Sequence, residues 1–344
     1  MTPVTAVILN WNGAALLEQF LPSVVASTYP ALEVLVADNG STDTSLDLLH
    51  TRFPQVRTLA LDQNYGFAEG NNRAIPHVTT PYVALVNSDV AVSPGWLEPL
   101  AAYLDTHPEA AAVQPAIRAW HAQDQFEYAG AAGGWMDLLG YPFCRGRIFD
   151  TVEHDQGQYP DTMPVFWATG ACCLVRMEVI REIGLFDAAF FAHMEEIDFC
   201  WRARNRGYEI ACVPASVVWH VGGGTLARAN PRKTYLNARN SLICLLKNLP
   251  APQLMFIFLA RLLLDGVWAA RALVQRDWQT PVAILRAHWA VFGRLGYWLR
   301  QRRTLHASGT PRWPLTGVYQ GSIVWAYFLR GHKTWREVFD PSPR

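Results

Sequence analysis

The feature that most constrains the fold is an alternation of apolar strands and amphipathic helices in the N-terminal part of the chain. Apolar, largely β-branched runs predict strands that are buried on both faces, at residues 4–10, 33–38, 56–61 and 82–87. Helical periodicity lies between them, at residues 14–26, 42–52 and 68–75. This alternation predicts an α/β fold, in which helices cover both faces of a mostly parallel sheet.

Polar side chains stand where three of these strands end. They are Asn10, Asp38 and the run Asn87-Ser88-Asp89. Because ligands of open parallel sheets bind at the carboxyl ends of the strands, these residues predict a binding site. Asp38 suits a turn, but it also suits acceptance of a hydrogen bond from the imide N–H of uracil or thymine. Asp89 suits a turn or a Mg²⁺ or Mn²⁺ ion that bridges a diphosphate, because hard cations prefer carboxylate oxygens.

A second group of candidates lies further along the chain. Glu195, Glu196 and Asp198 begin a helix predicted near 195–206, where acids favour the helix dipole. The preceding segment 190–194 is largely apolar, and a carboxylate in such company beside like charges gains the basicity that a general base needs. His220 ends a strand-like run and is followed by glycines. These glycines complete a G-x-G-x-x-A string, but no βαβ unit follows it, so we exclude a dinucleotide site.

The charge distribution divides the chain into two parts. Residues 1–243 hold 15 Lys and Arg against 25 Asp and Glu, whereas residues 244–344 hold 14 against 4. We therefore expect a catalytic domain at 1–245 and a basic, mostly helical region at 246–344. Arg-rich apolar stripes at 254–272 and 283–299 predict binding to an anionic membrane surface, or else a helical subdomain packed on the core. Nucleic acid is disfavoured, because the aromatic residues are not spaced as stacking platforms.

Few features of the sequence indicate the cellular compartment. The six cysteines form no C-x-x-C pair, which favours buried thiols in a reducing compartment. The N-terminus opens into a strand and shows no signal-peptide pattern. The apolar run 254–260 is too short to span a bilayer. We expect a cytoplasmic protein, peripheral on the inner face of the cell membrane.

Taken together, the motifs resemble those of family 2 inverting glycosyltransferases with the GT-A fold, a Rossmann-like, mostly parallel nucleotide-diphospho-sugar fold. The resemblance covers about residues 4–245 and is strongest to the rhamnosyltransferase-like branch, which builds bacterial surface polysaccharides. It rests on ordered motifs that begin with Val7-Ile-Leu-Asn-Trp-Asn-Gly13, Asp38-Asn-Gly-Ser-Thr-Asp43, Asn64-Tyr-Gly-Phe-Ala-Glu-Gly-Asn-Asn72 and Asn87-Ser-Asp-Val90. It continues with Ala168-Thr-Gly-Ala-Cys172, residues 190–202, Trp219-His220 and Arg239-Asn240.

The resemblance implies a role for each matching residue. Asp38 would recognise the pyrimidine base of the donor, with Asn10 beside it. The remaining nucleotide-sugar contacts would come from Asn64, Gly66, Asn71, Asn87, Ser88 and Gly170. Asp89 and His220 would bind Mg²⁺ or Mn²⁺. Glu196 would be the general base, with Glu195 as the alternative.

The resemblance also implies the reaction. A sugar from dTDP-rhamnose or a UDP-hexose would pass to a glycan or polyprenyl-linked acceptor by metal-assisted direct displacement with inversion. A nucleotidyltransferase is a second possibility, but it should carry a Gly- and Lys/Arg-rich phosphate loop where this chain has Asn10-Trp-Asn-Gly13. A third is a catalytically inactive membrane-bound scaffold of the same fold. It stays open because Asn87 replaces the first acid of the family's D-x-D motif and Glu196 stands where Asp is commoner.

Overall fold

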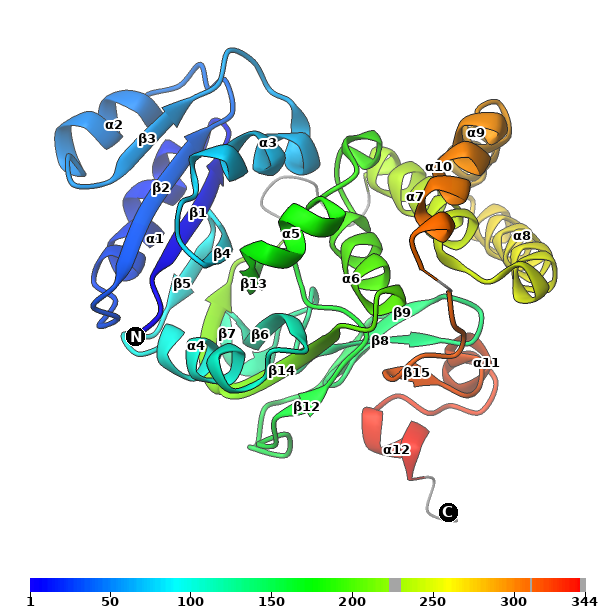
Figure 1. Ribbon diagram of the computed structural model, residues 1–344. Coiled ribbons are helices and arrows are strands. Elements are labelled where there is room, and N and C mark those ends of the chain that lie inside the picture. The colour runs from blue at the N-terminus through cyan, green and yellow to red at the C-terminus, as the bar shows by residue number, and fades with distance from the viewer. Residues whose placement is uncertain (223–229, 310, 341–344) are drawn as a thin grey trace.

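The computed structural model describes residues 1–222, 230–309 and 311–340. A ten-stranded sheet lies at its centre, in the order β12-β14-β6-β13-β4-β1-β2-β3, with β5 beside β14 and β7 beside β6 (Figure 1). Its strands are β1 (Val4–Asn10), β2 (Leu32–Asp38), β3 (Arg57–Ala60), β4 (Tyr82–Asn87), β5 (Val90–Val92), β6 (Ala110–Ala119), β7 (Ala122–Phe126), β12 (Met163–Pro164), β13 (Cys172–Arg176) and β14 (Glu209–His220).

The parallel strands expected from the N-terminal alternation are present. β1 pairs in parallel with both β2 and β4, so that Asn10 lies opposite Asp38 and Leu9 lies opposite Asn87. β3 continues the parallel order beside β2. The other half of the sheet is mixed, because β13 runs antiparallel to both β4 and β6. The register brings the polar ends of β1, β2 and β4 to one edge, as the sequence predicts.

Helices cover both faces of this sheet because side chains of successive strand residues point to opposite faces. In β1, Ile8 belongs to the core formed with α1 (Ala14–Val25), α2 (Ser45–Arg52) and α4 (Leu97–Thr106). Its neighbour Val7 belongs to the core on the opposite face. That second core includes residues from α3 (Gly66–Ala74), α5 (Met177–Ile183), α6 (Glu195–Asn205) and α7 (Pro231–Asn248).

The segment at 120–166, where the sequence predicts a loop or small ribbon, contributes most of a second sheet. This five-stranded sheet has the order β11-β10-β9-β8-β15. Its strands are β8 (Gly134–Asp137), β9 (Pro142–Cys144), β10 (Arg147–Ile148), β11 (Thr151–Val152) and β15 (Val318–Tyr319). β15 pairs in parallel with β8, so a segment near the C-terminus completes the sheet.

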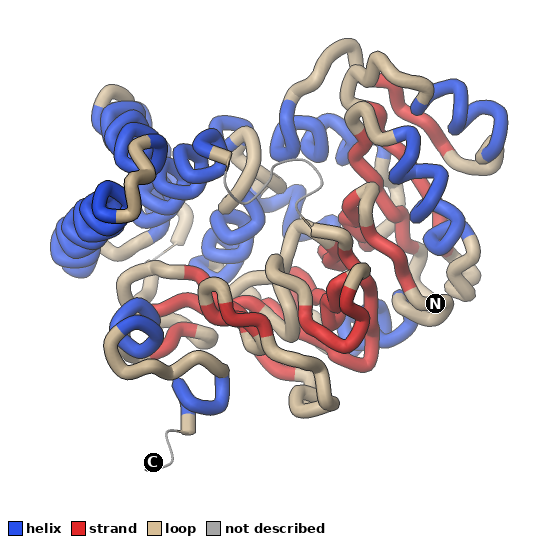
Figure 2. Tube along the Cα trace, turned by 180° about the vertical axis from the view of Figure 1, so that it is seen from behind, coloured by secondary structure: helices blue, strands red, loops and turns tan. Residues whose placement is uncertain are grey.

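Past the main sheet the chain is mostly helical. Helix α7 runs through the expected domain boundary at 245/246, and the following helices stand to one side of the molecule, in both views (Figures 1 and 2). They are α8 (Ala251–Val274), α9 (Gln279–Phe292) and α10 (Leu295–Ala307), followed by the short α11 (Ile323–Phe328) and α12 (Trp335–Phe339). The stripe expected over 283–299 is divided between α9 and α10, because the chain turns at Gly293 and Arg294. Among the helices described, none combines the length and apolarity needed to cross a bilayer.

Candidate active site

The ends of β1 and β2 are joined by side-chain hydrogen bonds. Asn10 Nδ2 donates to Asp38 Oδ2 over 2.9 Å, and the Ser41 N–H donates to Asp38 Oδ1 over 2.8 Å. Asn10 and Asp38 are both buried, and Asn10 Oδ1 has no hydrogen-bond partner. A Cβ on Gly13 would lie only 2.4 Å from that oxygen, so glycine lets the backbone pass close to it. Asp38 is thus fixed in place, and the two side chains present oxygen acceptors at the strand ends.

The segment predicted to follow the donor's ribose and diphosphate is tied to β2 by Asn39. Asn39 Nδ2 donates to Asn64 Oδ1 and to the Gly66 carbonyl, each over 3.1 Å. Gly66 has φ +78, and a Cβ there would lie 2.6 Å from the Phe191 ring, so the position requires glycine. Asn71 is buried and donates to the Phe67 carbonyl of its own helix over 2.9 Å. In this arrangement Asn64, Gly66 and Asn71 shape the loop and helix that border the site.

Asp89 and His220 face each other where β4 meets β5 and where β14 ends. Asp89 Oδ1 lies 3.1 Å from His220 Nε2, and both side chains are largely buried. On the other side of the ring, Glu127 Oε2 lies 3.3 Å from His220 Nδ1. Burial alone would lower the pKa of His220, but Asp89 and Glu127 outweigh it and raise the pKa to about 10. Without a metal ion, the two carboxylates therefore favour a charged imidazolium.

This pair also has the chemistry of a divalent-ion site. Asp89 Oδ1 and His220 Nε2, which lie 3.1 Å apart, are an oxygen and a nitrogen donor that could together hold a divalent ion. The position of Glu127 behind Nδ1 is typical of carboxylates that orient metal-binding histidines. Within the described ranges, no three His, Cys, Asp or Glu side chains form a group that could hold a metal ion.

Glu195 and Glu196 begin α6 but have different surroundings. Glu195 is buried, whereas Glu196 is partly exposed, and each has one buried oxygen without a hydrogen-bond partner. Burial raises the pKa of Glu195 well above its usual range, and the Glu196 charge adds to this effect. Burial also raises the pKa of Glu196, to about 7. Burial thus raises the pKa of both carboxyl groups at the start of α6.

Gly170 connects Glu196 to the polar strand ends. A Cβ on Gly170 would lie 3.9 Å from the Glu196 Cβ and 3.4 Å from the Phe67 ring. The next residue, Ala171, accepts a hydrogen bond over 2.9 Å from the N–H of Asn87. Asn87 and Ser88 are partly exposed at this edge. The structure thus places Glu196 on the rim that carries the predicted Asn87-Ser88-Asp89 motif.

The loop before Glu195 has an unusual backbone. Phe191, His193 and Met194 all have positive φ, with values of 66, 67 and 73. Conformations of this kind cost about 1–3 kcal/mol each for residues other than glycine and persist only where the surroundings fix them. They point the chain so that α6 starts with Glu195 and Glu196.

Two neighbouring residues of α7 hold this loop. Asn240 Nδ2 lies 2.7–3.1 Å from three backbone carbonyls, those of Phe190, Ala192 and His193. Arg239 Nη2 donates to the Ala189 and Phe190 carbonyls over 2.9 and 2.8 Å. On the opposite side, the Phe67 N–H donates to the Phe191 carbonyl over 2.8 Å. The carboxylate-bearing segment is therefore fixed between α3 and α7.

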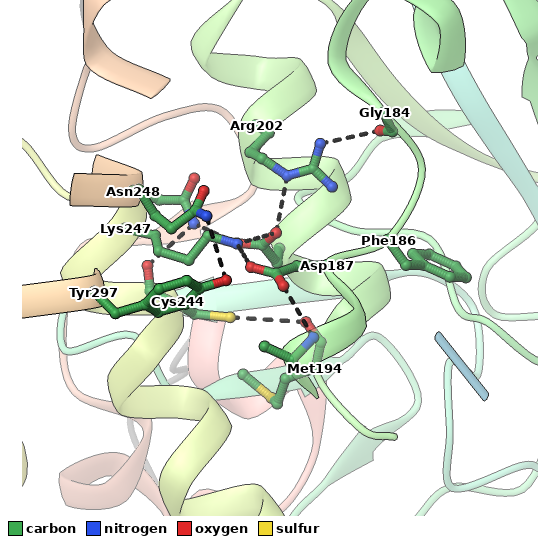
Figure 3. Close-up of polar contacts among 12 residues, drawn as sticks. Gly184, Phe186, Asp187, Met194, Arg202, Cys244, Lys247, Asn248 and Tyr297 are labelled. Carbon is green, nitrogen blue, oxygen red and sulfur yellow. Dashed lines mark hydrogen bonds and ion pairs between the residues drawn. The ribbon is translucent and has the colours of Figure 1, made fainter. Parts of the chain in front are cut away.

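Asp198, the third acid of the cluster, belongs to a buried ion network (Figure 3). Lys247 Nζ lies 2.7 Å from Asp187 and 2.9 Å from Asp198, and Arg202 Nε lies 2.8 Å from Asp198. Asn248 donates to the other Asp198 oxygen over 2.9 Å. Burial would raise the pKa of Asp198, but the charges of Lys247 and Arg202 outweigh it and lower the pKa to about 2. Asp198 is an ionised structural anchor, in contrast to the two glutamates.

Several residues of the site are not recognisable from the sequence. Glu127 comes from the aperiodic segment after β6, and only the fold brings it to His220. Asn39, Asn240 and Lys247 act on backbone or on buried charges of segments distant in sequence. The Arg239-Asn240 motif can be recognised in the sequence. Its contact with the loop before Glu195 cannot be recognised there. A buried Lys in an otherwise apolar helical run was a second signal, because such a side chain needs a charged partner.

Comparison with known proteins agrees with this geometry. The sequence profile described as "Glycosyltransferase like family 2" matches residues 2–237. The chain belongs to glycosyltransferase family 2. It is 31% identical over 239 residues to the N-acetylglucosaminyl-diphospho-decaprenol L-rhamnosyltransferase of Mycobacterium tuberculosis, a match that covers 64% of this chain and 76% of that protein. This family 2 glycosyltransferase thus has the rhamnosyltransferase-like character that its motifs suggest.

Solved structures confirm the GT-A fold of this glycosyltransferase. S. aureus TarS 1–349 in complex with UDP-GlcNAc matches with a TM-score of 0.56 at 17% identity, covering 89% of this chain and 87% of that one. The mannosyltransferase PcManGT from Pyrobaculum calidifontis, solved with GDP-Man and Mn²⁺, matches with a TM-score of 0.52 at 16% identity, covering 89% and 86%. At these identities the likeness concerns the fold alone.

Proposed function

We propose that this glycosyltransferase moves a sugar from a nucleotide-diphospho-sugar to a lipid-linked glycan acceptor, with inversion, in cell-surface polysaccharide synthesis. dTDP-rhamnose is the first candidate donor and a UDP-hexose the second. The similarity to a rhamnosyltransferase whose name specifies a diphospho-decaprenol acceptor supports this choice. The observation that carries the proposal is the position of Glu196, a carboxylate of raised pKa, on the rim that also holds Asp38 and Asp89.

The nucleotide end of the donor would lie at β1 and β2. Asp38 keeps lone pairs beyond those used by Asn10 and Ser41, and these would accept a hydrogen bond from the imide N–H of the base. The unpartnered Asn10 Oδ1 offers a second acceptor close by. Asn64, Gly66 and Asn71 would border the ribose and diphosphate.

The diphosphate would lie beside Asp89 and His220. These two residues would hold a Mn²⁺ or Mg²⁺ ion, with Glu127 orienting the imidazole from behind. When bound, the ion would supply positive charge that neutralises the departing diphosphate. Asn87 and Ser88, at the end of the neighbouring strand, would contact the sugar or phosphate oxygens.

Glu196 would act on the acceptor. As the hydroxyl oxygen of the acceptor forms a bond to the anomeric carbon, the bond from that carbon to the diphosphate oxygen breaks. Glu196 takes the proton of the hydroxyl group. One displacement from the opposite face inverts the configuration of the anomeric carbon. Burial raises the pKa of Glu195 well above its usual range, so we assign the base to Glu196, whose pKa of about 7 suits proton transfer near neutral pH.

Purified protein incubated with Mn²⁺ and a panel of nucleotide sugars tests the proposal through slow donor hydrolysis. We expect nucleotide release from one donor, abolished by EDTA and by Asp89→Ala. Calorimetry with UDP and dTDP tests binding of the nucleotide alone. Absence of both hydrolysis and nucleotide binding would overturn the proposal in favour of the inactive scaffold. Formation of pyrophosphate from a nucleoside triphosphate and a sugar 1-phosphate would support the nucleotidyltransferase instead.

A further inference from the structure

Two helices of the C-terminal region expose continuous apolar stripes. On α8 the stripe contains Phe256, Leu259, Leu263, Val267 and Val274, of which Phe256 is 78% exposed and Val274 is 85% exposed. On α9 the stripe contains Trp278, Val282, Leu285, Trp289 and Phe292, with Trp289 81% exposed. The spacing of three or four residues places each set on one side of its helix. Contiguous apolar surface of this kind marks an interaction site.

The stripes lie on the sides of these helices that do not pack on the catalytic domain. The buried side of α8 contacts α7 through Arg261, which donates to Ser241 over 2.9 Å. The buried side of α9 contacts the same helix through Ile284 and Ala287, which cluster with Ala238. The two exposed surfaces meet where Phe292 packs edge-on against Phe258, with ring centroids 6.2 Å apart.

Charge around the stripes is almost entirely positive. Six exposed arginines lie on α8–α10 and their connections, namely Arg271, Arg276, Arg286, Arg294, Arg300 and Arg303. Of the acids in residues 251–307, Asp265 is buried and paired with His288 at 2.9 Å, which leaves Asp277 as the exposed one. A twofold contact between copies of this surface would bring the arginines together. An anionic bilayer instead offers apolar depth for the stripes and negative charge for the arginines.

We propose that the α8–α9 surface, defined by these two stripes and the six arginines, docks on the surface of an anionic lipid bilayer. The helices lie along the interface and do not cross it. Helix α7 carries α8 and α9 on one part of its surface and holds the loop before Glu195 with Arg239 and Asn240. Docking would therefore connect the membrane to the base through a single helix. The assignment of a lipid-linked acceptor depends on the proposed function, whereas docking on the bilayer does not.

Co-sedimentation with vesicles tests the proposal. We expect the full chain to bind phosphatidylcholine vesicles that contain phosphatidylglycerol, and to bind pure phosphatidylcholine vesicles much less. The double variant Leu263→Ser and Trp289→Ser should bind the anionic vesicles about tenfold more weakly or worse, since each side chain loses apolar burial. Arg286→Gln with Arg294→Gln should weaken binding and reduce its salt dependence.

Two matched controls carry substitutions on the catalytic domain. Trp11→Ser removes an exposed Trp, and Arg52→Gln removes an exposed Arg, and vesicle binding should stay unchanged in both. Donor hydrolysis without vesicles should be the same in the stripe variant and the wild type, which separates docking from the proposed catalysis. A protein that stays in the supernatant overturns the proposal. If light scattering then shows a dimer that the stripe variant dissociates, the surface is a self-interface.

Discussion

Glu195 and Glu196 are adjacent in sequence, and burial raises the pKa of both carboxyl groups. Because the pKa of Glu196 is raised to about 7, a base at this position is protonated at low pH and gains activity as the pH rises through about 7. Glu196→Gln should lower the transfer rate by about 10²- to 10⁴-fold and remove this pH dependence. Glu195→Gln keeps Glu196 and should therefore keep a rate that rises with pH. Rate–pH profiles of the three proteins measure this.

The reverse outcome would reassign the base. If Glu195→Gln removed both the activity and the pH dependence while Glu196→Gln kept them, the buried carboxyl group would be the base. Nucleotide binding to each variant serves as the control, because neither glutamate is expected to contact the nucleotide. A variant that binds the nucleotide normally has kept its fold.

Glu127 leads to a prediction about metal binding by Asp89 and His220, the proposed ligands. Glu127→Gln removes the negative charge beside His220 Nδ1, and such substitutions behind a metal ligand typically weaken binding by about 10- to 100-fold. We expect Mn²⁺, titrated by calorimetry in the presence of the nucleotide, to bind at least about tenfold more weakly. Glu109→Gln, an exposed carboxylate of the same domain, is the matched control. Equal Mn²⁺ affinity in all three proteins would show that Glu127 does not orient His220.

At the residue scale, the sequence revealed groups at the ends of regular elements and missed those that act through tertiary contacts. Asp38 and Asp89 follow predicted strands, and the fold brings them to the expected edge. Glu127 follows no periodic signal, because it comes directly after the five-residue strand β7, which is too short to show a clear pattern. Its place beside His220 depends on the path of β6 and β14, which local pattern does not specify.

At the scale of elements, α7 holds the loop that leads to Glu196, the proposed base. Asn240→Ala removes the amide whose two N–H groups lie within reach of three carbonyls in the loop before Glu195. We expect kcat to fall about tenfold while KM for the donor stays unchanged, because a small displacement of Glu196 affects proton transfer and not nucleotide binding. Steady-state kinetics measure both constants. Asn237→Ala, on the same helix, should leave both at wild-type values.

A different effect of Asn240→Ala on kcat and KM would contradict this positioning role. If Asn240→Ala raised KM and left kcat unchanged, the residue would serve substrate binding instead. The melting temperature of each variant controls for general destabilisation, since loss of a purely structural contact lowers it without changing the pH profile of the remaining activity.

Local sequence pattern predicts where helices and strands begin and end better than it predicts which strands pair with each other. The predicted helix at 68–75 corresponds to α3 (Gly66–Ala74), and the acids at 195–198 do begin α6. The pairing of β15 with β8 was not predictable, because a two-residue strand has no periodicity to detect. The turn at Gly293 and Arg294 was likewise hidden within a continuous apolar stripe.

At the scale of the whole molecule, the catalytic and C-terminal regions share structure and are not simply joined. Helix α7 contributes to the core below the main sheet and also supports α8 and α9. The second sheet takes strands from residues 134–152 and from residues 318–319. The acidic N-terminal part and the basic C-terminal part of the sequence thus belong to one interlocked molecule.

The stability of this shared architecture should depend on Lys247, the buried cation at the end of α7. Lys247→Met leaves Asp198 and Asp187 without their common partner, and removing one member of a buried ion network costs about 3–5 kcal/mol of unfolding free energy. Arg52→Met, which breaks an exposed pair with Glu18, should cost at most about 1 kcal/mol. Denaturant unfolding at pH 7 compares the two variants.

Because the folded pKa of Asp198 is lowered to about 2 from an ordinary 3.8, the stabilisation that Asp198 provides is present above pH 4 and is lost as the pH falls towards 2. The difference between wild type and Lys247→Met should therefore shrink in acid, and a difference that is independent of pH would mean that Lys247 stabilises the fold by packing alone.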